Sequence, residues 1–542
     1  MENTSTEEGW TLATFKLITA AIGRADRNQA LSLASEALQR GDDQPLVLML
    51  AAEQLEQQGD TMGALQLLKR AVDREQDEPE LWRRYGQLLA QHGRWAEGLE
   101  AFDEALDIDP QNRLVVLAAG EASYRAGSLR RALDYYRRAD DMLPEQSEVV
   151  SAIAAIYAGL QDSARAREFG ERALRWTDNS VNAHMAIARA DLLDGNPARA
   201  LNRVIPLLQT QTIARIALLD IAAEASDALD RPPEAFDFYA ERNSFLDRAY
   251  LPKMQAESAE RRVDQARRIT RWLNALEPDD WPVSHSRPKT AGHAFILGFP
   301  RSGTTLLEKG LAGHPKIVTL PEIDLLSNCV SEFLQSDEGM DRLSGLTNDQ
   351  LEVLRDRYWD EADRMLGGNL ANKVVVDKMP LHTLALPLIN RLFPSASIVF
   401  AIRDPRDVVL SCFRRRFQIN SAMYEFLSLE RAAKFYDAVM HLAEVAVTVL
   451  PMNLLQVRHE AVVANFDGEL GKLLAFMHLE WDEAVRGFDE RAKAAPRTPS
   501  DLQLRKGLNR NGVDQWKRYA DQLLPVMPIV DRWVARFNYS TR

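Results

Sequence analysis

A 34-residue period runs through the first half of the chain. Alanines recur with this step at Ala37, Ala71, Ala105, Ala139 and Ala173, and glycines at Gly59, Gly93 and Gly127. A fixed period of this length is typical of a helix–turn–helix unit that buries its apolar face only against neighbouring copies. The period therefore predicts an all-α solenoid for this half.

Residues 79–112 are the clearest copy of the repeat and resemble a tetratricopeptide repeat. The consensus places of that repeat are filled by Trp82, Gly86, Phe102, Ala105 and Pro110. Residues 45–248 divide into six such units, and we expect residues 1–248 to form the solenoid domain. Later copies diverge, since Gln161 stands where a glycine is expected before Gly195 restores the phase. The groove of such a solenoid could recruit a protein or peptide acceptor, or the repeats could serve only as a scaffold or a dimerisation surface.

Charge is unevenly distributed along the chain. Residues 1–250 carry 41 acidic and 27 basic side chains, out of 79 and 66 in the whole protein of 542 residues. A nucleic-acid partner for this half is therefore not expected, because binding needs a cationic face. The chain has two cysteines, no signal-type opening and no apolar run of the roughly twenty residues that a membrane helix needs. We expect a soluble, cytoplasmic protein without a membrane partner.

The 34-residue repeat is followed by a charged helix and linker over residues 249–289, after which the pattern of apolar residues changes. From residue 290 to 542, apolar runs alternate with helical stretches: AFILGF, KVVVDKMP, ASIVFAIRD and NLLQVRHE. Strands alternating with helices predict a parallel α/β sheet, in which ligands bind at the carboxyl ends of the strands. The expected fold is therefore an α-helical solenoid followed by a P-loop-like α/β domain.

Residues 295–315, FILGFPRSGTTLLEKGLAGHP, predict a strand, an anion-binding loop and a helix start. Gly298 and Gly303 have the spacing of a nucleotide-binding P-loop, but Thr304 stands where that loop has its lysine. Backbone N–H groups and side chains can still form a phosphate cradle, with candidates Arg301, Ser302, Gly303, Thr304 and Thr305. Without a Walker-B aspartate for Mg²⁺, the loop predicts a single phosphate-like group and no metal.

A second phosphate clamp is predicted in IRDPRDVVLSCFRR. Arg403 ends a strand, and Ser411 and Arg415 follow at steps of eight and four. If a helix runs from Pro405, Ser411 and Arg415 lie on one face of it.

Together the two motifs resemble those of sulfotransferases that use 3′-phosphoadenosine 5′-phosphosulfate (PAPS). The closest resemblance is to the tetratricopeptide-repeat sulfotransferases, related to tyrosylprotein sulfotransferases. It implies that Arg301 to Thr305 hold the 5′-phosphosulfate and that Arg403, Ser411 and Arg415 hold the 3′-phosphate. It also implies that Glu322 is the catalytic base, that Lys378 and Arg301 support the transfer, and that a segment with Arg505, Lys506, Gly507 and Trp516 closes on the donor.

Three positions depart from the family pattern. His459 replaces a tyrosine, and Asn511 and Gly512 replace a serine pair. Glu322 could instead be a helix N-terminal carboxylate, Lys378 could pair with Asp377, and His382 is a rival base.

The expected activity is transfer of a sulfuryl group to an acceptor hydroxyl. A protein tyrosine, a carbohydrate and a small phenol all remain open as the acceptor. The alternatives are a nucleotide-dependent kinase or NTPase, and a repeat adaptor whose transferase domain is inactive.

Overall fold

The computed structural model describes residues 4–210, 214–256, 260–277, 281–282, 289–368, 370–488, 490–491 and 512–540. The chain divides into two compact units, residues 1–229 and residues 230–542. We expected the solenoid to extend to residue 248, whereas this division places helix α14 (Pro232–Ala256) in the second unit.

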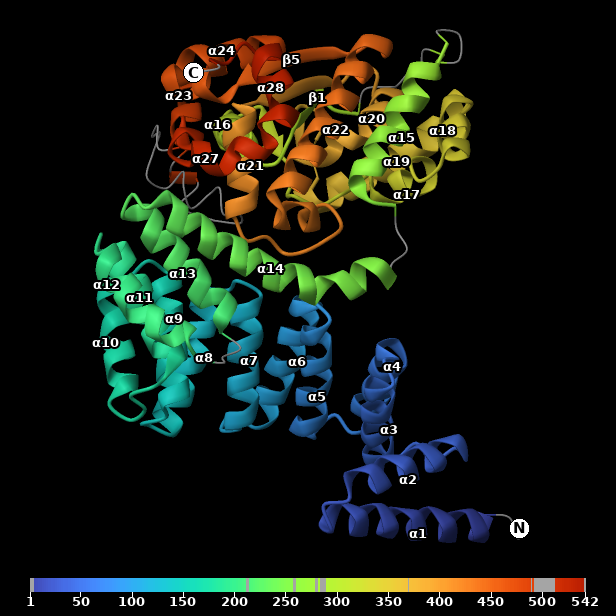
Figure 1. Ribbon diagram of the computed structural model, residues 1–542. Coiled ribbons are helices and arrows are strands. Elements are labelled where there is room, and N and C mark those ends of the chain that lie inside the picture. Colours follow the sequence, from blue (N-terminus) through green and yellow to red (C-terminus); the bar gives the residue numbers. More distant parts are fainter. Residues whose placement is uncertain are drawn as a thin grey trace. The chain divides into compact units, whose positions relative to one another are not determined.

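The first unit consists of antiparallel helix pairs (Figure 1). These helices are α1 (Thr4–Gly23), α2 (Arg27–Gln39), α3 (Pro45–Gln57), α4 (Thr61–Arg74), α5 (Pro79–Gln91), α6 (Trp95–Ile108), α7 (Arg113–Arg125), α8 (Leu129–Met142), α9 (Ser147–Gly159), α10 (Ser163–Leu174), α11 (Val181–Leu193), α12 (Pro197–Leu208) and α13 (Arg215–Ala228). The recurring alanines are fully buried between helices. The predicted helical repeat is confirmed, and α1 and α2 add a pair before residue 45.

The turn inside each pair repeats the same backbone geometry. Gly59, Gly93, Gly127 and Gly195 have φ of 86°, 78°, 76° and 73°. Ala25 and Gln161 occupy the same phase of the period, with φ of 58° and 64°. Glycine is favoured here because a side chain disfavours the left-handed conformation. The 34-residue phase therefore extends back to the α1–α2 turn.

The second unit is built on a five-stranded parallel sheet of order β2-β3-β1-β4-β5. The strands are β1 (Gly292–Gly298), β2 (Ile317–Thr319), β3 (Val374–Lys378), β4 (Ser397–Ile402) and β5 (Asn453–Arg458). The predicted parallel α/β fold is confirmed. The short edge strand β2 was not predicted, because its three residues lie between the His-Pro turn and Pro321.

Helices cover both faces of this sheet. After α14, the helices described in this unit are α15 (Arg262–Ala275), α16 (Thr304–Leu311), α17 (Ser327–Phe333), α18 (Asp337–Ser344), α19 (Asn348–Leu366), α20 (Leu386–Leu392), α21 (Pro405–Arg414), α22 (Leu429–Val449), α23 (His459–Ala464), α24 (Phe466–Phe476), α27 (Ala520–Leu523) and α28 (Met527–Arg536), with 3-10 turns η2 (Pro380–Ala385), η3 (Met423–Leu427), η4 (Glu483–Arg486), η5 (Gln515–Tyr519) and η6 (Leu524–Val526).

Alternate residues of β1 enter different layers, as strand geometry requires. Ala294 and Ile296 join the core formed with α16 and α24. Phe295 instead packs on Tyr358 of α19 and on Phe393, with ring centroids 6.5 and 5.8 Å apart. In the part of the chain that the structure describes, no helix is long and apolar enough to span a membrane.

Helix α14 is bonded into the second unit through the carboxyl end of α21. Arg242, 1% exposed, donates to the carbonyl oxygens of Phe413 and Arg414, each at 3.1 Å. Asn243 Nδ2 donates to the Phe413 carbonyl at 3.0 Å. A cation at a helix carboxyl end is stabilising because it faces unpaired carbonyl groups. Helix α14 thus fixes the end of the helix that carries Ser411.

Candidate active site

The loop after β1 is shaped by its glycines. Gly298 has φ of 146°, and a Cβ there would lie 2.5 Å from the Ala401 carbonyl oxygen of β4. Gly303 has φ of 95°, and a Cβ there would collide with the His459 ring. Between them, Arg301 adopts a φ of 72°. The backbone therefore turns tightly into α16, whose first residues are Thr304 and Thr305.

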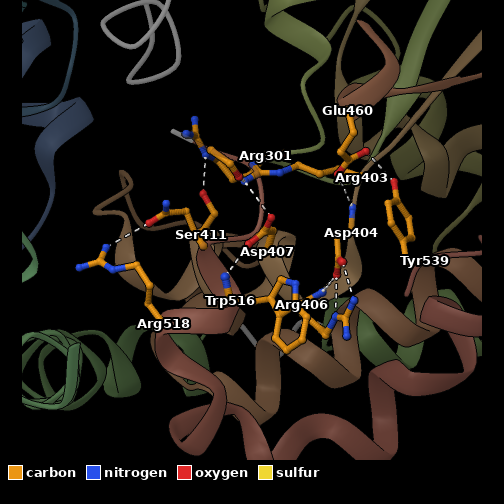
Figure 2. A network of polar contacts seen from close by, with 12 residues as sticks. Arg301, Arg403, Asp404, Arg406, Asp407, Ser411, Glu460, Trp516, Arg518 and Tyr539 are labelled. Atoms are coloured by element: carbon orange, nitrogen blue, oxygen red, sulfur yellow. Dashed lines mark hydrogen bonds and ion pairs between the residues drawn. The ribbon is translucent and has the colours of Figure 1, made fainter. Parts of the chain in front are cut away.

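Residues of the two predicted phosphate-binding motifs lie close together (Figure 2). Arg301 Nε donates to Ser411 Oγ at 3.1 Å, and Arg403 Nη1 donates to the Arg301 carbonyl at 2.9 Å. Burial, reinforced by Arg415 and Arg403, lowers the pKa of Arg301 to about 9. Several cations held so closely in a buried place favour an anionic ligand, which would relieve their mutual repulsion.

Arg415 reaches this group in a different way from the one expected. Helix α21 ends at Arg414, and Arg415 follows it in an extended conformation with ψ of 141°. It still lies close enough to Arg301 to lower the pKa of that guanidinium, after burial. Arg505, Lys506, Gly507 and Asn511 lie outside the described residues.

The start of α21 is held by acidic side chains that sequence reasoning missed. Asp407 Oδ1 accepts from the backbone N–H of Trp516 at 2.7 Å, and Arg406 lies 3.6 Å from the centre of the Trp516 ring. Burial raises the pKa of Asp407 to about 6, although Arg403 opposes the shift. Arg403 also donates to the Gly512 carbonyl. Trp516 and Gly512 are thereby joined to the predicted 3′-phosphate motif.

A second connection runs from the end of β5 to residues near 540 (Figure 2). Glu460 accepts from the Asp404 backbone N–H at 3.0 Å and from the Tyr539 hydroxyl at 2.7 Å. Arg406 Nη2 donates to the Ser540 carbonyl at 2.7 Å. His459, beside Glu460, is half-buried, and desolvation together with Arg403 and Arg301 lowers its pKa to about 3. Its imidazole is therefore neutral at pH 7.

Lys378 and Glu322 are in contact, as the predicted catalytic roles require. The Lys378 ammonium pairs with the Glu322 carboxylate and, at 3.0 Å, with Glu308 Oε2 of α16. Lys378 is 1% exposed, whereas the Glu322 side chain is 40% exposed. Asp377, the alternative partner considered for Lys378, lies on the opposite face of β3. Successive residues of β3 point to opposite faces, and Asp377 accepts from the Tyr358 hydroxyl at 3.0 Å.

His382 belongs to a separate polar group in the same region. Its Nε2 lies 2.9 Å from Asp324 Oδ1, and its Nδ1 lies 4.0 Å from Asp377 Oδ1. Burial acts to raise the pKa of Asp324, but the hydrogen bond and charge of His382 outweigh it and the pKa is lowered. Burial raises the pKa of Asp377.

A cavity of about 400 Å³ joins these elements. Its wall contains Arg301, Thr304 and Thr305 of the loop, together with Glu322. Asp324, His382 and Arg262 also line it, and the remainder is mainly apolar: Pro300, Val330, Met379, Pro380, Leu381, Leu384, Ala385, Phe417, Ala422 and Met423. A cavity of this size with a few polar groups is typical of a small-molecule or side-chain binding site.

Comparison with known proteins agrees with this arrangement. Residues 294–483 match the sulfotransferase family, and residues 49–113 match the tetratricopeptide repeat. Residues 294–483 form a sulfotransferase-family domain. The sulfotransferase domain includes both predicted phosphate motifs, Glu322 and Lys378.

Three relatives show the range of similarity. An uncharacterised protein of Aquifex aeolicus is 26% identical over 260 residues, 46% of this chain and 34% of its own length. Protein-tyrosine sulfotransferase A of Caenorhabditis elegans is 26% identical over 203 residues, 36% of this chain and 52% of its own. The Drosophila melanogaster protein-tyrosine sulfotransferase is 24% identical over 270 residues, 47% and 53% of the two chains. The match thus spans about a third to a half of each relative's length.

Glu308, Asp324 and Asp407 make contacts around the candidate site that were not predicted from the sequence. Each is one acidic residue in an ordinary helix or loop, with a partner 58 to 109 residues away in the chain. Only the fold brings the partners together. Asp404 offered a weak signal, because an aspartate before Pro405 is a common helix N-cap.

Proposed function

We propose that this protein transfers a sulfuryl group from PAPS to an acceptor hydroxyl. The observation that carries the proposal is the cavity lined both by Glu322, which pairs with Lys378, and by Arg301, Thr304 and Thr305 of the phosphate loop. A base and part of an anion cradle on one cavity, with a buried cation paired to the base, suit proton removal from an acceptor beside a phosphosulfate.

The donor side fits the side chains present. Arg301 to Thr305 would hold the 5′-phosphosulfate, and Arg403, Ser411 and Arg415 the 3′-phosphate. The buried Arg403 Nε has no hydrogen-bond partner among the described residues, so it can bind a phosphate oxygen. When bound, PAPS supplies the sulfuryl group on its 5′-phosphate.

In this proposal, Glu322, Lys378 and Arg301 each have a role in the transfer to the acceptor. Glu322 accepts the proton of the acceptor hydroxyl, and its 40% exposed side chain reaches the cavity. Lys378 and Arg301 stabilise the negative charge that grows on oxygen as the bond to sulfur breaks. The apolar wall excludes water and receives the body of the acceptor.

The protein-tyrosine sulfotransferases among the relatives and the tetratricopeptide repeats favour a protein or peptide acceptor. In this proposal the repeat groove binds the polypeptide and raises its concentration near the cavity. A scaffold role for the repeats would leave transfer to small phenols and to proteins equally dependent on them.

Labelled sulfate tests the proposal. Purified protein is incubated with [35S]PAPS and a cell lysate, and protein, glycan and small-molecule fractions are separated. We expect label in the protein fraction without ATP or added Mg²⁺. A kinase or NTPase would instead consume ATP with Mg²⁺, and an inactive adaptor would neither transfer label nor bind adenosine 3′,5′-bisphosphate.

A further inference from the structure

The buried ammonium of Lys378 lies between two carboxylates, and the proposed chemistry uses only one of them. Glu322 faces the cavity, whereas the Glu308 side chain is 11% exposed and lies on α16. Glu308 Oε2 is 3.0 Å from Lys378 Nζ. The Lys378 ammonium is therefore shared between two carboxylates, and the second of them, Glu308, also has the Lys309 ammonium 3.6 Å away.

The position of Glu308 follows from the fold of the phosphate loop. It stands four residues after Thr304, so both lie on the same side of α16. Lys378 shares its strand face with Val374 and Val376, which pack in the core under α16. Lys309 of the same helix lies 3.6 Å from Glu308, and Arg262, Arg301, Asp324 and His382 line the cavity together with Glu322. Asp377 lies on the opposite face of β3, with Tyr358.

We propose that Glu308 is a positioning residue for the transfer: it keeps the Lys378 ammonium beside Glu322 while weakening the hold of that ammonium on the Glu322 carboxylate. An ion pair with a single partner stabilises a carboxylate and makes it a weaker base. A second carboxylate on the same ammonium opposes this effect by its own negative charge. The inference rests on the proposed function, because it defines Glu308 by the role of Glu322 as the base.

The test measures the protonation of Glu322 in the full-length protein. Its carboxyl band in the infrared spectrum is assigned by the loss of that band in Glu322→Gln. In Glu308→Gln we expect the pH midpoint of this band to fall by about one pH unit, because the negative charge that competes with Glu322 for Lys378 is then removed. Glu308→Asp keeps the negative charge and should restore the midpoint. Glu430→Gln removes one exposed carboxylate from α22 and should leave it unchanged.

The outcomes separate this inference from the proposed function. An unchanged midpoint in Glu308→Gln, or equal shifts in the Gln and Asp variants, would overturn the role of Glu308. If the midpoint falls as expected and the parent transfers sulfate from PAPS, the acid limb of its pH–rate profile should move to lower pH in Glu308→Gln. If the midpoint falls but the parent transfers no sulfate from PAPS, the charge sharing stands and the proposed function fails.

Discussion

At the scale of single residues, Glu322 is the group whose loss should separate chemistry from donor binding. Glu322→Gln keeps the shape of the side chain but removes its ability to take a proton, so turnover should fall by about 10²–10⁴-fold. Binding of adenosine 3′,5′-bisphosphate, measured by calorimetry, should stay nearly unchanged. His382→Ala should lower turnover less, because His382 is paired with Asp324. Near-normal turnover in Glu322→Gln would make His382 the first alternative base.

Ser411 tests the 3′-phosphate assignment. Its hydroxyl accepts from Arg301 Nε at 3.1 Å, at the meeting point of the two phosphate motifs. Ser411→Ala should weaken PAPS binding by about 1.5–3 kcal/mol, because a hydrogen bond to a charged group is lost. Adenosine 5′-phosphosulfate lacks the 3′-phosphate and should bind poorly and lose little more in this variant. Equal losses for the two nucleotides, measured by calorimetry, would contradict the assignment.

At the scale of elements, the repeat turns offer a matched pair of stability tests. Gln161 adopts a φ of 64° where other repeats have glycine, and Gly195 has φ of 73° at the next turn. Gln161→Gly should raise the free energy of unfolding by about 0.5–1 kcal/mol, because glycine has no penalty in the left-handed region. Gly195→Ala should lower the free energy of unfolding by a similar amount, because alanine is strained in the left-handed region. The added methyl group meets no neighbour, so no clash adds to this loss. Calorimetric unfolding of the full chain measures both, and changes of the same sign would contradict this account.

Sequence periodicity was enough to predict the helices of the repeat and four of the five strands. Gln161 was noticed as a departure, but its left-handed backbone is a property of the folded turn. Glu322 and Lys378 were predicted through resemblance, and their contact required the fold. Glu308 could not be recognised from the sequence, because glutamates are common in the first turns of helices. Only the fold pairs it with Lys378, 70 residues later in the chain.

At the scale of the whole molecule, the unit boundary determines which fragment should fold. A fragment of residues 230–542 keeps Arg242 and Asn243, which satisfy carbonyl groups at the end of α21. A fragment of residues 249–542 loses both side chains, together with the packing of Phe236 on Phe413 at 5.0 Å, and opens these carbonyl groups to water. The longer fragment should have the higher melting temperature when both are measured with adenosine 3′,5′-bisphosphate present. Indistinguishable fragments would show that α14 is dispensable.

The bonds from Tyr539 to Glu460 and from Arg406 to the Ser540 carbonyl have a consequence for biosynthesis. The repeats need only neighbouring residues and can fold while the ribosome is still translating the rest. The second unit cannot form these two bonds until Tyr539 and Ser540 have left the exit tunnel. Nascent chains halted before that point should therefore carry a folded solenoid and an incompletely folded second unit, which is the stage at which a chaperone would be needed.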